Sequence, residues 1–367
     1  MKRKINTYML VCIMAFLAVV GFYGCNATGG AEFPSFEDFR SKGAIVDASI
    51  CTVKNGYSGI VTVISDDGYY ESGVILNELA KEFNLNVTVA GAVRIIKPNL
   101  HEWQRIEREG KVDLVSHSYS HIKVAPDKNL TNEQVLHEYL CAKEWYEKHF
   151  NSPSFTIVAP ENITTAYGFS IWEEMGILAA RLGARGENPL KQHIEYGVAQ
   201  GQWLNLRMRG LYDADDTDGR NAWIDAAIKN ETWLIEMWHD ISPEGNTHFQ
   251  PITTVKAREH LKYISEQQQL KKIWAASFTQ AVSYLYQRDW GSVEAYKIKD
   301  SIAVVYKRMR QDLPWEDFNV PVTVKIPLGS SANIKQVCTE NESIKFERVN
   351  DGILFDLPTD GTVVYLK

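Results

Sequence analysis

Apolar and polar positions alternate in blocks along the chain, and the blocks predict strands and helices in turn. The run "GIVTVIS" over 59–65 is apolar and β-branched, which is typical of a buried strand. The following "ESGVILNELAKEFN" has its apolar residues at helical spacing, and the alternation returns in "NVTVAGAV", "LHEWQRIEREG" and "VDLVSHS". Thr131 and Gln134 then predict a capping box at the start of the amphipathic helix "TNEQVLHEYLCAKEWYEKHF".

The pattern continues less evenly towards residue 290. Strands are predicted in "SFTIVAP", "ILAARLG", "TWLIEMWHDI" and the start of "IWAASFTQAVSYLYQRD". Helices are predicted in "AYGFSIWEEMG", "NAWIDAAIKN" and "TVKAREHLKYISEQQQL", whereas residues 184–220 are less regular. About seven β/α units in a row predict an α/β protein with a parallel sheet, and this number fits a closed barrel better than an open sheet. We expect this barrel over residues 46–290.

From residue 291 the pattern changes to short alternating runs. "VEAYKIKDSIAVVYKR", "VPVTVKIPL" and "IKFERVNDGILFDLP" are separated by turn signals, among them "NDG". Residues 291–367 are therefore predicted to form a small all-β sandwich domain.

Composition narrows the function classes. The chain is 45% hydrophobic and 23% charged, which is ordinary for a folded protein. Its net charge of −7 argues against a nucleic acid as partner. The five cysteines show no CxxC or Cys/His spacing, so Cys51, Cys141 and Cys338 are expected to be packing residues.

The first 24 residues are expected to be a signal peptide. "KRK" precedes the charge-free stretch "YMLVCIMAFLAVVGF", which is too short with these flanks for a membrane span. "FYGC" resembles a bacterial lipoprotein box with Cys25 as the lipidated residue, and ordinary cleavage or a retained anchor are the alternatives. The protein is thus predicted to be an exported cell-envelope lipoprotein, periplasmic or on the cell surface. Residues 25–45 would be a flexible linker, and the lipid would be the only contact with a membrane.

Two acidic residues, Asp66 and Asp67, directly follow the first strand in "ISDDG". A tight turn is the usual reason for such a sequence. The third strand ends in "SHSYSH", which places His117 and His121 four residues apart in the loop after it. Because the carboxyl ends of barrel strands meet at one rim, the acidic pair and the histidine pair are expected to lie together.

One carboxylate and two imidazoles form a ligand set suited to Zn²⁺ or a similar divalent ion, with positions left for water and substrate. Consecutive residues of an extended chain point in opposite directions. The two aspartates are therefore expected to divide the work, one on the metal and the other free to act as a base. Another strand ends in "EMWHDI", where His239 could donate a proton to a leaving group.

These motifs together resemble the polysaccharide deacetylase family, the NodB-homology or carbohydrate esterase family 4 fold. "ISDDG", "GKVDLVSHSYSH" and the strand ending in His239 carry the resemblance, which covers about residues 58–288. It implies a distorted (β/α)₇ barrel that removes acetyl groups from glycans with one divalent metal ion, Zn²⁺ foremost and Co, Ni, Mn or Fe as alternatives. By motif position the resemblance implies Asp66 as the base, His239 as the acid, and Asp67, His117 and His121 as metal ligands.

The third motif departs from the family pattern, which is Arg-x-Pro-x-Gly. Here "VAPEN" has Val158 and Asn162 where the pattern has arginine and glycine. Arg181 or Arg185 is expected to reach the base instead. Backbone N–H groups that help to hold an oxyanion are expected in the same segment, near Pro160, Glu161 and Asn162.

The sequence therefore predicts a metal-dependent hydrolase that removes N-acetyl or O-acetyl groups from a polysaccharide outside the cytoplasm. One alternative is a glycan-binding protein on a catalytically weakened deacetylase barrel, which the altered third motif favours and the intact acidic pair and histidines oppose. Another metal hydrolase, such as a phosphoesterase, is the second alternative. An acidic rim makes anionic substrates less attractive for it.

Overall fold

The computed structural model describes residues 35–190, 203–211, 217–244, 248–318, 320–329 and 334–367. The expected signal peptide over 1–24 and the expected lipidation at Cys25 lie outside these residues. Within the described ranges, no helix is long and apolar enough to cross a membrane.

Parallel strands of the described chain close into a seven-stranded barrel, which confirms the predicted fold class. The ring closes where β10 pairs with β3, from Trp233 opposite Ile60 to Trp238 opposite Ser65. In spatial order the barrel strands are β3 (Gly59–Ser65), β4 (Val87–Gly91), β5 (Val112–Ser116), β6 (Thr156–Val158), β7 (Ala179–Arg185), β9 (Leu206–Gly210) and β10 (Thr232–Trp238). Two further strands join this sheet, namely β13 (Ile273–Ala275) beside β3 and the antiparallel β8 (Asn188–Pro189) beside β10.

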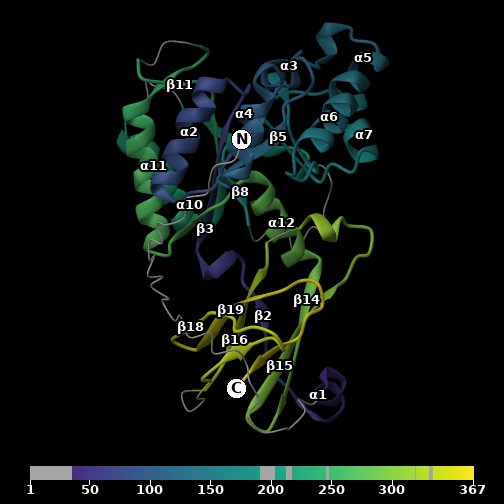
Figure 1. The fold of residues 1–367 in the computed structure, drawn as a ribbon, viewed down its shortest axis with the longest axis vertical. Helices are drawn as coiled ribbons and strands as arrows, with labels where there is room; N and C mark the ends of the chain where they lie inside the picture. Colours follow the sequence, from purple (N-terminus) through teal and green to yellow (C-terminus); the bar gives the residue numbers. More distant parts are fainter. Residues whose placement is uncertain (1–34, 191–202, 212–216, 245–247, 319, 330–333) are drawn as a thin grey trace, which may run out of the picture.

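Helices cover the outside of the barrel (Figure 1). They are α2 (Tyr70–Phe83), α3 (Val93–Ile96), α4 (Leu100–Arg108), α5 (Asn132–Leu136), α6 (Ala142–His149), α7 (Ala166–Glu174), α10 (Thr217–Asn230) and α11 (Thr254–Gln269). The predicted capping box is confirmed, because Thr131 and Gln134 bond reciprocally at the start of α5. Short turns are η1 (Lys54–Gly56), η2 (Lys97–Asn99), η3 (Pro126–Lys128), the π-helical η4 (His137–Cys141), η5 (Pro160–Asn162) and η6 (Trp315–Asp317). Two short strands, β11 (Ile241–Ser242) and β12 (Ile252–Thr253), pair with each other.

Two antiparallel sheets form the predicted all-β domain. One has the order β1 (Ala44–Ile45), β14 (Gly291–Ile298), β15 (Ser301–Arg308), β20 (Val364–Leu366) and β17 (Val337–Cys338). The other has the order β18 (Phe346–Val349), β19 (Gly352–Leu357), β16 (Val322–Pro327) and β2 (Ser49–Ile50). The "NDG" turn joins β18 to β19 as a hairpin, as its sequence predicts.

The expected linker over 25–45 is wrong for its last ten residues. Residues 36–42 form α1 (Phe36–Lys42), and β1 and β2 pair with β14 and β16 of the sandwich. The reason is packing, because Phe39 is buried in a small apolar cluster of the sandwich with Ala303 and Tyr365. The segment before the barrel therefore belongs to the β domain, and residues 49–50 lie outside the barrel that was expected to start at 46.

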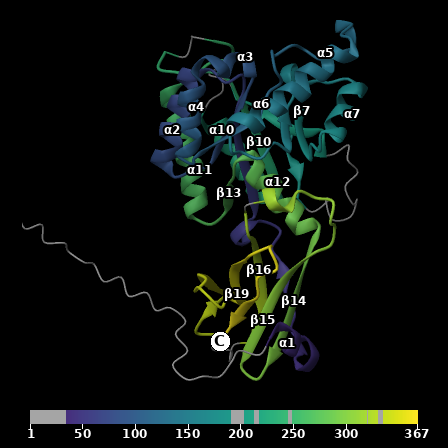
Figure 2. The ribbon, with the colours of Figure 1, turned by 45° about the vertical axis from the view of Figure 1, so that its right-hand side comes forward.

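Helix α12 (Phe278–Asp289) joins the two domains. Every side chain from Phe278 to Arg288 except that of Gln280 is buried, so the helix is enclosed on nearly every side. The amide of Gln287 donates to the carbonyl of Val320 at 2.6 Å, and the hydroxyl of Tyr306 donates to the carbonyl of Gln287 at 2.7 Å. One hydrophobic core runs from the barrel interior past α12 into the sandwich. Figures 1 and 2 show α12 between the two domains.

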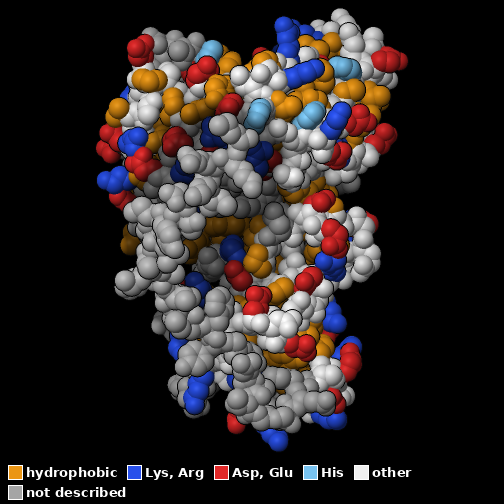
Figure 3. All heavy atoms as spheres, viewed as in Figure 1, with side chains coloured by type: hydrophobic (Ala, Val, Ile, Leu, Met, Phe, Trp, Pro, Cys, Tyr) orange, Lys and Arg blue, Asp and Glu red, His pale blue; other side chains and the backbone are white. Residues whose placement is uncertain are grey.

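The sandwich contributes no histidine. None occurs after residue 290, and the histidine side chains visible in Figure 3 lie over the barrel half only. The chemistry predicted from the sequence must therefore be built on the barrel.

Candidate active site

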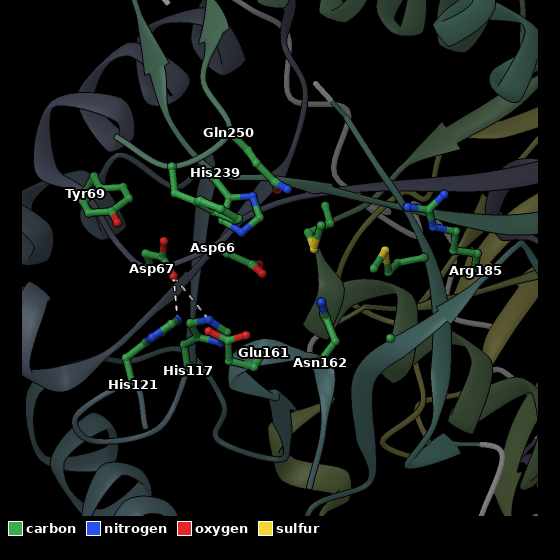
Figure 4. Close-up of a pocket in the computed structure, with 14 residues that line it drawn as sticks. Asp66, Asp67, Tyr69, His117, His121, Glu161, Asn162, Arg185, His239 and Gln250 are labelled. Carbon is green, nitrogen blue, oxygen red and sulfur yellow. Dashed lines mark ion pairs between the residues drawn. The ribbon is translucent and has the colours of Figure 1, made fainter. Parts of the chain in front are cut away.

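The predicted site residues gather around one cavity at the carboxyl ends of the barrel strands (Figure 4). The cavity has a volume of about 400 Å³. Every predicted site residue except Pro160, Arg181 and Cys25 lines it: Asp66 and Asp67 follow β3, His117 and His121 follow β5, Glu161 and Asn162 follow β6, Arg185 ends β7, and His239 follows β10.

Asp67 meets both histidines of the "SHSYSH" motif. Its Oδ1 lies 2.9 Å from Nε2 of His121 and 3.5 Å from Nε2 of His117. The ligating atoms of these three residues lie within 4.8 Å of one another. Nδ1 of His117 lies 2.8 Å from the carbonyl oxygen of Val158, a contact that fixes the proton on Nδ1 and leaves Nε2 free to ligate. The residues present therefore fit a divalent metal ion with open positions.

The charges of this cluster are coupled. Burial raises the pKa of Asp67, but its interactions with the side chains of His117 and His121 outweigh burial and hold that pKa well below its usual range. The hydrogen bond to Asp67 in turn raises the pKa of His121. A metal ion that binds here must therefore compete with protons for the nitrogen of His121.

A buried carboxylate fixes the loop between the two histidines. Glu138, which is 2% exposed, accepts hydrogen bonds from Oγ of Ser118 at 2.9 Å, from N of Ser120 at 2.9 Å and from Oγ of Ser120 at 2.5 Å. Ser118 also accepts from the backbone N–H of His121 at 3.1 Å. Glu138 lies in the π-helical turn η4, a feature often found at functional sites.

The backbone adopts a left-handed conformation in both loops that carry the cluster, the loop after β3 and the loop after β5. Asp67 has φ of 69°, Ser118 of 67° and His121 of 62°. Residues other than glycine rarely take such angles, and they persist only where the surroundings enforce them. The hydrogen bonds from Ser118 and Ser120 to Glu138 supply that enforcement in the histidine loop.

Asp66 takes a different role from Asp67. It is 3% exposed, and its Oδ2 accepts a hydrogen bond from Nη2 of Arg181 at 2.5 Å. Its other oxygen, Oδ1, is buried and has no hydrogen-bond partner among the described residues. The structure thus separates the two aspartates, one on the histidines and one on an arginine, and leaves Asp66 with an open acceptor.

Arg181 is the arginine that reaches Asp66, and Arg185 is not. Arg181 is fully buried and also donates to Oδ1 of Asn162 through Nη1. Arg185 lines the same cavity, but none of its described contacts is an ion pair with Asp66. Val158 and Arg181 are register partners on β6 and β7, so the arginine lies directly across from the position where the third motif has its own.

The turn "VAPEN" keeps a left-handed backbone without glycine. Glu161 has φ of 54° and Asn162 has φ of 58°. Asparagine tolerates this conformation better than most residues, which explains how it can occupy the glycine position of the motif. Within the turn, N of Asn162 donates to O of Ala159 at 3.1 Å and N of Ile163 donates to O of Pro160 at 3.4 Å.

His239 lies on the same cavity and is 8% exposed. Its Nδ1 is buried without a partner among the described residues, and Phe249 meets its ring edge-on at a centroid distance of 5.0 Å. Burial lowers the pKa of His239, while Asp66 and Asp67 oppose the shift. A protonated His239 would therefore give up its proton readily.

Sequence reasoning missed several residues of the site. Tyr69 lines the cavity, and burial together with the charge of Asp67 raises its pKa to about 12. Phe249 and Gln250 also line the cavity, and Glu138 supports it from behind. Only Tyr69 could have been found from the sequence, because it follows Asp67 by two residues. Phe249, Gln250 and Glu138 lie in segments without a motif.

Comparisons with known proteins give matches among solved structures only, all at low sequence identity. No family model matches the chain, and no curated protein matches it. Among solved structures, a carbohydrate esterase family 4 pseudoenzyme from Bacillus anthracis is 13% identical over 61% of this chain and 65% of its own, with a TM-score of 0.42. The chain thus spans just under two thirds of the length of that protein.

Two other solved structures align over most of their length. A family 4 carbohydrate esterase from Streptomyces lividans, in complex with acetate, is 14% identical over 61% of this chain and 93% of its own, with a TM-score of 0.39. A family 4 acetyl xylan esterase from Clostridium thermocellum, in complex with a cobalt ion, is 14% identical over 62% of this chain and 90% of its own, with a TM-score of 0.41. These structures carry the name of the family that the sequence motifs resemble.

Proposed function

We propose that the protein is a metal-dependent hydrolase that removes acetyl groups from a polysaccharide. The observation that supports it most is the division between the two adjacent aspartates. Asp67 joins His117 and His121, whereas Asp66 is held by Arg181 with Oδ1 left open beside the same cavity. A turn alone would not need two buried carboxylates with separate partners.

Asp67, His117 and His121 would hold the divalent ion, with Zn²⁺ preferred for this ligand set and Co, Ni, Mn or Fe as alternatives. When bound, such an ion polarises a carbonyl oxygen and lowers the pKa of water. The hydrogen bond from His117 to Val158 and the hold of Glu138 on the loop keep the ligands oriented before any ion arrives.

The proton transfers fall to Asp66 and His239. Oδ1 of Asp66 takes the proton of the attacking water, while Arg181 fixes the carboxylate through Oδ2. His239 gives a proton to the departing amine or alkoxide, which its lowered pKa favours. This pairing of a base with an acid across one cavity suits hydrolysis of an ester or an amide.

The turn after β6 supports the oxyanion. Pro160 has no N–H, and the N–H groups of Asn162 and Ile163 already donate within the turn. The backbone N–H of Glu161 is therefore the donor that remains for an oxyanion at this point. Of the three residues expected to bind the oxyanion, only Glu161 has a backbone N–H that can do so.

The glycan-binding alternative rests on Val158, which stands where the third motif has an arginine. Arg181 weakens that alternative, because it supplies a guanidinium to Asp66 from the neighbouring strand. Action outside the cytoplasm is part of the proposal and is supported by the sequence pattern of residues 1–25 alone.

Acetate release tests the proposal directly. Protein stripped with a chelator and reloaded with Zn²⁺ would be assayed on acetylated xylan, acetylated chitooligosaccharides and peptidoglycan fragments. We expect release from at least one substrate, loss of release after stripping and recovery on reloading. Glycan binding without acetate release at any metal concentration would favour the binding protein instead.

A further inference from the structure

The segment His248–Gln250, called here the rim segment, lies beside His239 at the edge of the cavity. Phe249 lines the cavity and is 59% exposed, although its edge-on contact with His239 covers one side. A ligand that covered this exposed phenyl ring would gain free energy from the apolar area removed from water.

Gln250 adds a polar group to the same edge. Its side-chain oxygen Oε1 is buried and has no hydrogen-bond partner among the described residues. Its backbone has φ of 46°, which is in the left-handed region and holds the side chain beside His239 (Figure 4). A buried acceptor without a donor is costly, and a donor on a bound ligand would satisfy it.

The rim segment is anchored on both sides. The ring of His248 stacks on Tyr69 with centroids 4.1 Å apart and planes within 6°. The backbone N–H of His248 donates to Oδ2 of Asp240 at 3.1 Å, and N of Ile252 donates to O of Asp240 at 2.9 Å. The phenyl ring and the amide are thus held in place before a ligand binds, which lowers the entropic cost of binding.

We propose that the rim segment is a sugar subsite, in which Phe249 stacks on a pyranose ring and Gln250 accepts a hydrogen bond from that sugar. One face of a pyranose ring carries C–H groups that suit an aromatic surface, while its edge carries O–H or N–H donors. This inference rests on the proposed function, because it places the sugar that bears the acetyl group. The contact with His239 puts the ring next to the group that protonates the sugar leaving group.

Two kinds of sugar could supply the hydrogen-bond donor to Gln250. An N-acetyl sugar brings an amide N–H, and an O-acetyl sugar brings a neighbouring hydroxyl. The glucosamine tetrasaccharide and xylotetraose, together with their N-acetylated and O-acetylated forms, separate these sources, and the weaker binder identifies the sugar that the subsite does not fit.

Binding of the deacetylated tetrasaccharides tests the subsite without any turnover. Titration calorimetry on the Zn²⁺-loaded protein would compare wild type with Phe249→Ala, Phe249→Trp and Gln250→Met. Loss of the ring in Phe249→Ala is expected to weaken binding about 10-fold, or about 1.4 kcal/mol. Phe249→Trp should stay within about threefold of wild type, and Gln250→Met should bind about fivefold more weakly because it lacks the acceptor.

Met309→Ala is the matched control, because Met309 is 57% exposed and lies in the sandwich, away from the residues that line the cavity. On acetylated substrate, the KM of Phe249→Ala should rise with its Kd while kcat falls less than about threefold. Equal affinity in Phe249→Ala and Met309→Ala, or a fall in kcat with unchanged KM, would overturn the subsite. If wild type binds the sugars through Phe249 but releases no acetate, the subsite stands and the proposed hydrolase function fails.

Discussion

Val158 and Arg181 occupy register positions on β6 and β7, and only Arg181 carries a charge. In a parallel sheet such partners project on the same side, so an arginine at either position points into the same part of the barrel. Position 158 holds valine where the motif that the sequence resembles has an arginine, and Asp66 receives its guanidinium from Arg181 instead. The arginine that holds the base is thus relocated from β6 to the neighbouring strand β7.

An exchange of these two residues tests the relocation. Arg181→Val should lower acetate release by about 10²-fold, because the base loses its orienting partner. The double variant Val158→Arg/Arg181→Val should recover at least about tenfold of that loss, since the guanidinium returns to the same space. Arg185→Gln is the comparison variant and should have a smaller effect than Arg181→Val. A double variant as inactive as the single one would contradict the relocation.

The two aspartates should fail differently when each becomes asparagine. Asp66→Asn should keep the metal and lose about 10²- to 10⁴-fold in kcat, because general-base catalysis is removed. Asp67→Asn should weaken metal binding first, and excess metal should restore part of its activity. Elemental analysis and acetate release on both variants decide the matter. Equal metal loss in both would show that the aspartates do not divide the work.

Metal affinity should depend on pH through His121. The hydrogen bond to Asp67 raises the pKa of His121, so protons compete with the metal up to a higher pH than usual. Below that pKa, the apparent affinity for Zn²⁺ should fall about 10-fold per pH unit for one displaced proton. Competition with a chromophoric chelator from about pH 5 to about pH 8 measures how the apparent affinity for Zn²⁺ changes with pH. His121→Gln should bind more weakly and with a flatter slope.

Glu138→Gln should loosen the histidine loop without touching the metal ligands. Glutamine keeps the size of the side chain but replaces one acceptor oxygen by a donor, so it cannot accept all three hydrogen bonds that Ser118 and Ser120 donate to the two oxygens of Glu138. We expect about a 10-fold loss of metal affinity. Glu144→Gln, at an exposed position of α6, is the matched control and should leave the affinity unchanged. A Glu138→Gln protein with wild-type affinity would rule out the positioning role.

Removal of the sandwich should unfold the barrel. A chain ending at residue 290 would expose α12, whose side chains pack on both domains, and would lose the bonds of Gln287 to the sandwich. Circular dichroism and gel filtration should show an aggregated or unfolded product, whereas a chain beginning at Ser35 should melt like the full protein. A monomeric, metal-binding fragment of residues 53–290 would refute this expectation.

The barrel and the metal cluster could be predicted because each depends on local signals. Apolar runs mark strands such as β3, and the carboxyl ends of those strands must meet at one rim, which brings Asp67 to His121. Strand β9 was missed because "LRMRG" mixes arginine with apolar residues, and its side chains alternate between buried and exposed positions. The two-residue strands β1 and β2 were missed because they are too short to show a period.

Other parts of the site depend on tertiary contacts that a sequence pattern does not carry. Arg181 and Arg185 were equivalent in the sequence, and only the register of β6 with β7 places Arg181 on Asp66. Glu138 lies in the middle of a helical pattern, where a glutamate normally faces solvent. Its burial follows from the extra residue of the π-helical turn, which no propensity predicts.

Both ends of the described chain lie on the sandwich. Ser35 caps α1, which packs beside β14, and Lys367 directly follows β20. In Figure 1, α3 and β11, which follow the carboxyl ends of β4 and β10, lie at the end of the barrel away from the sandwich. The residues that line the cavity follow the carboxyl ends of the barrel strands as well. A tether attached to either chain end would hold the molecule by its sandwich and point the cavity outward. The length of the molecule would then set how far from the attachment surface the cavity can reach a polymer.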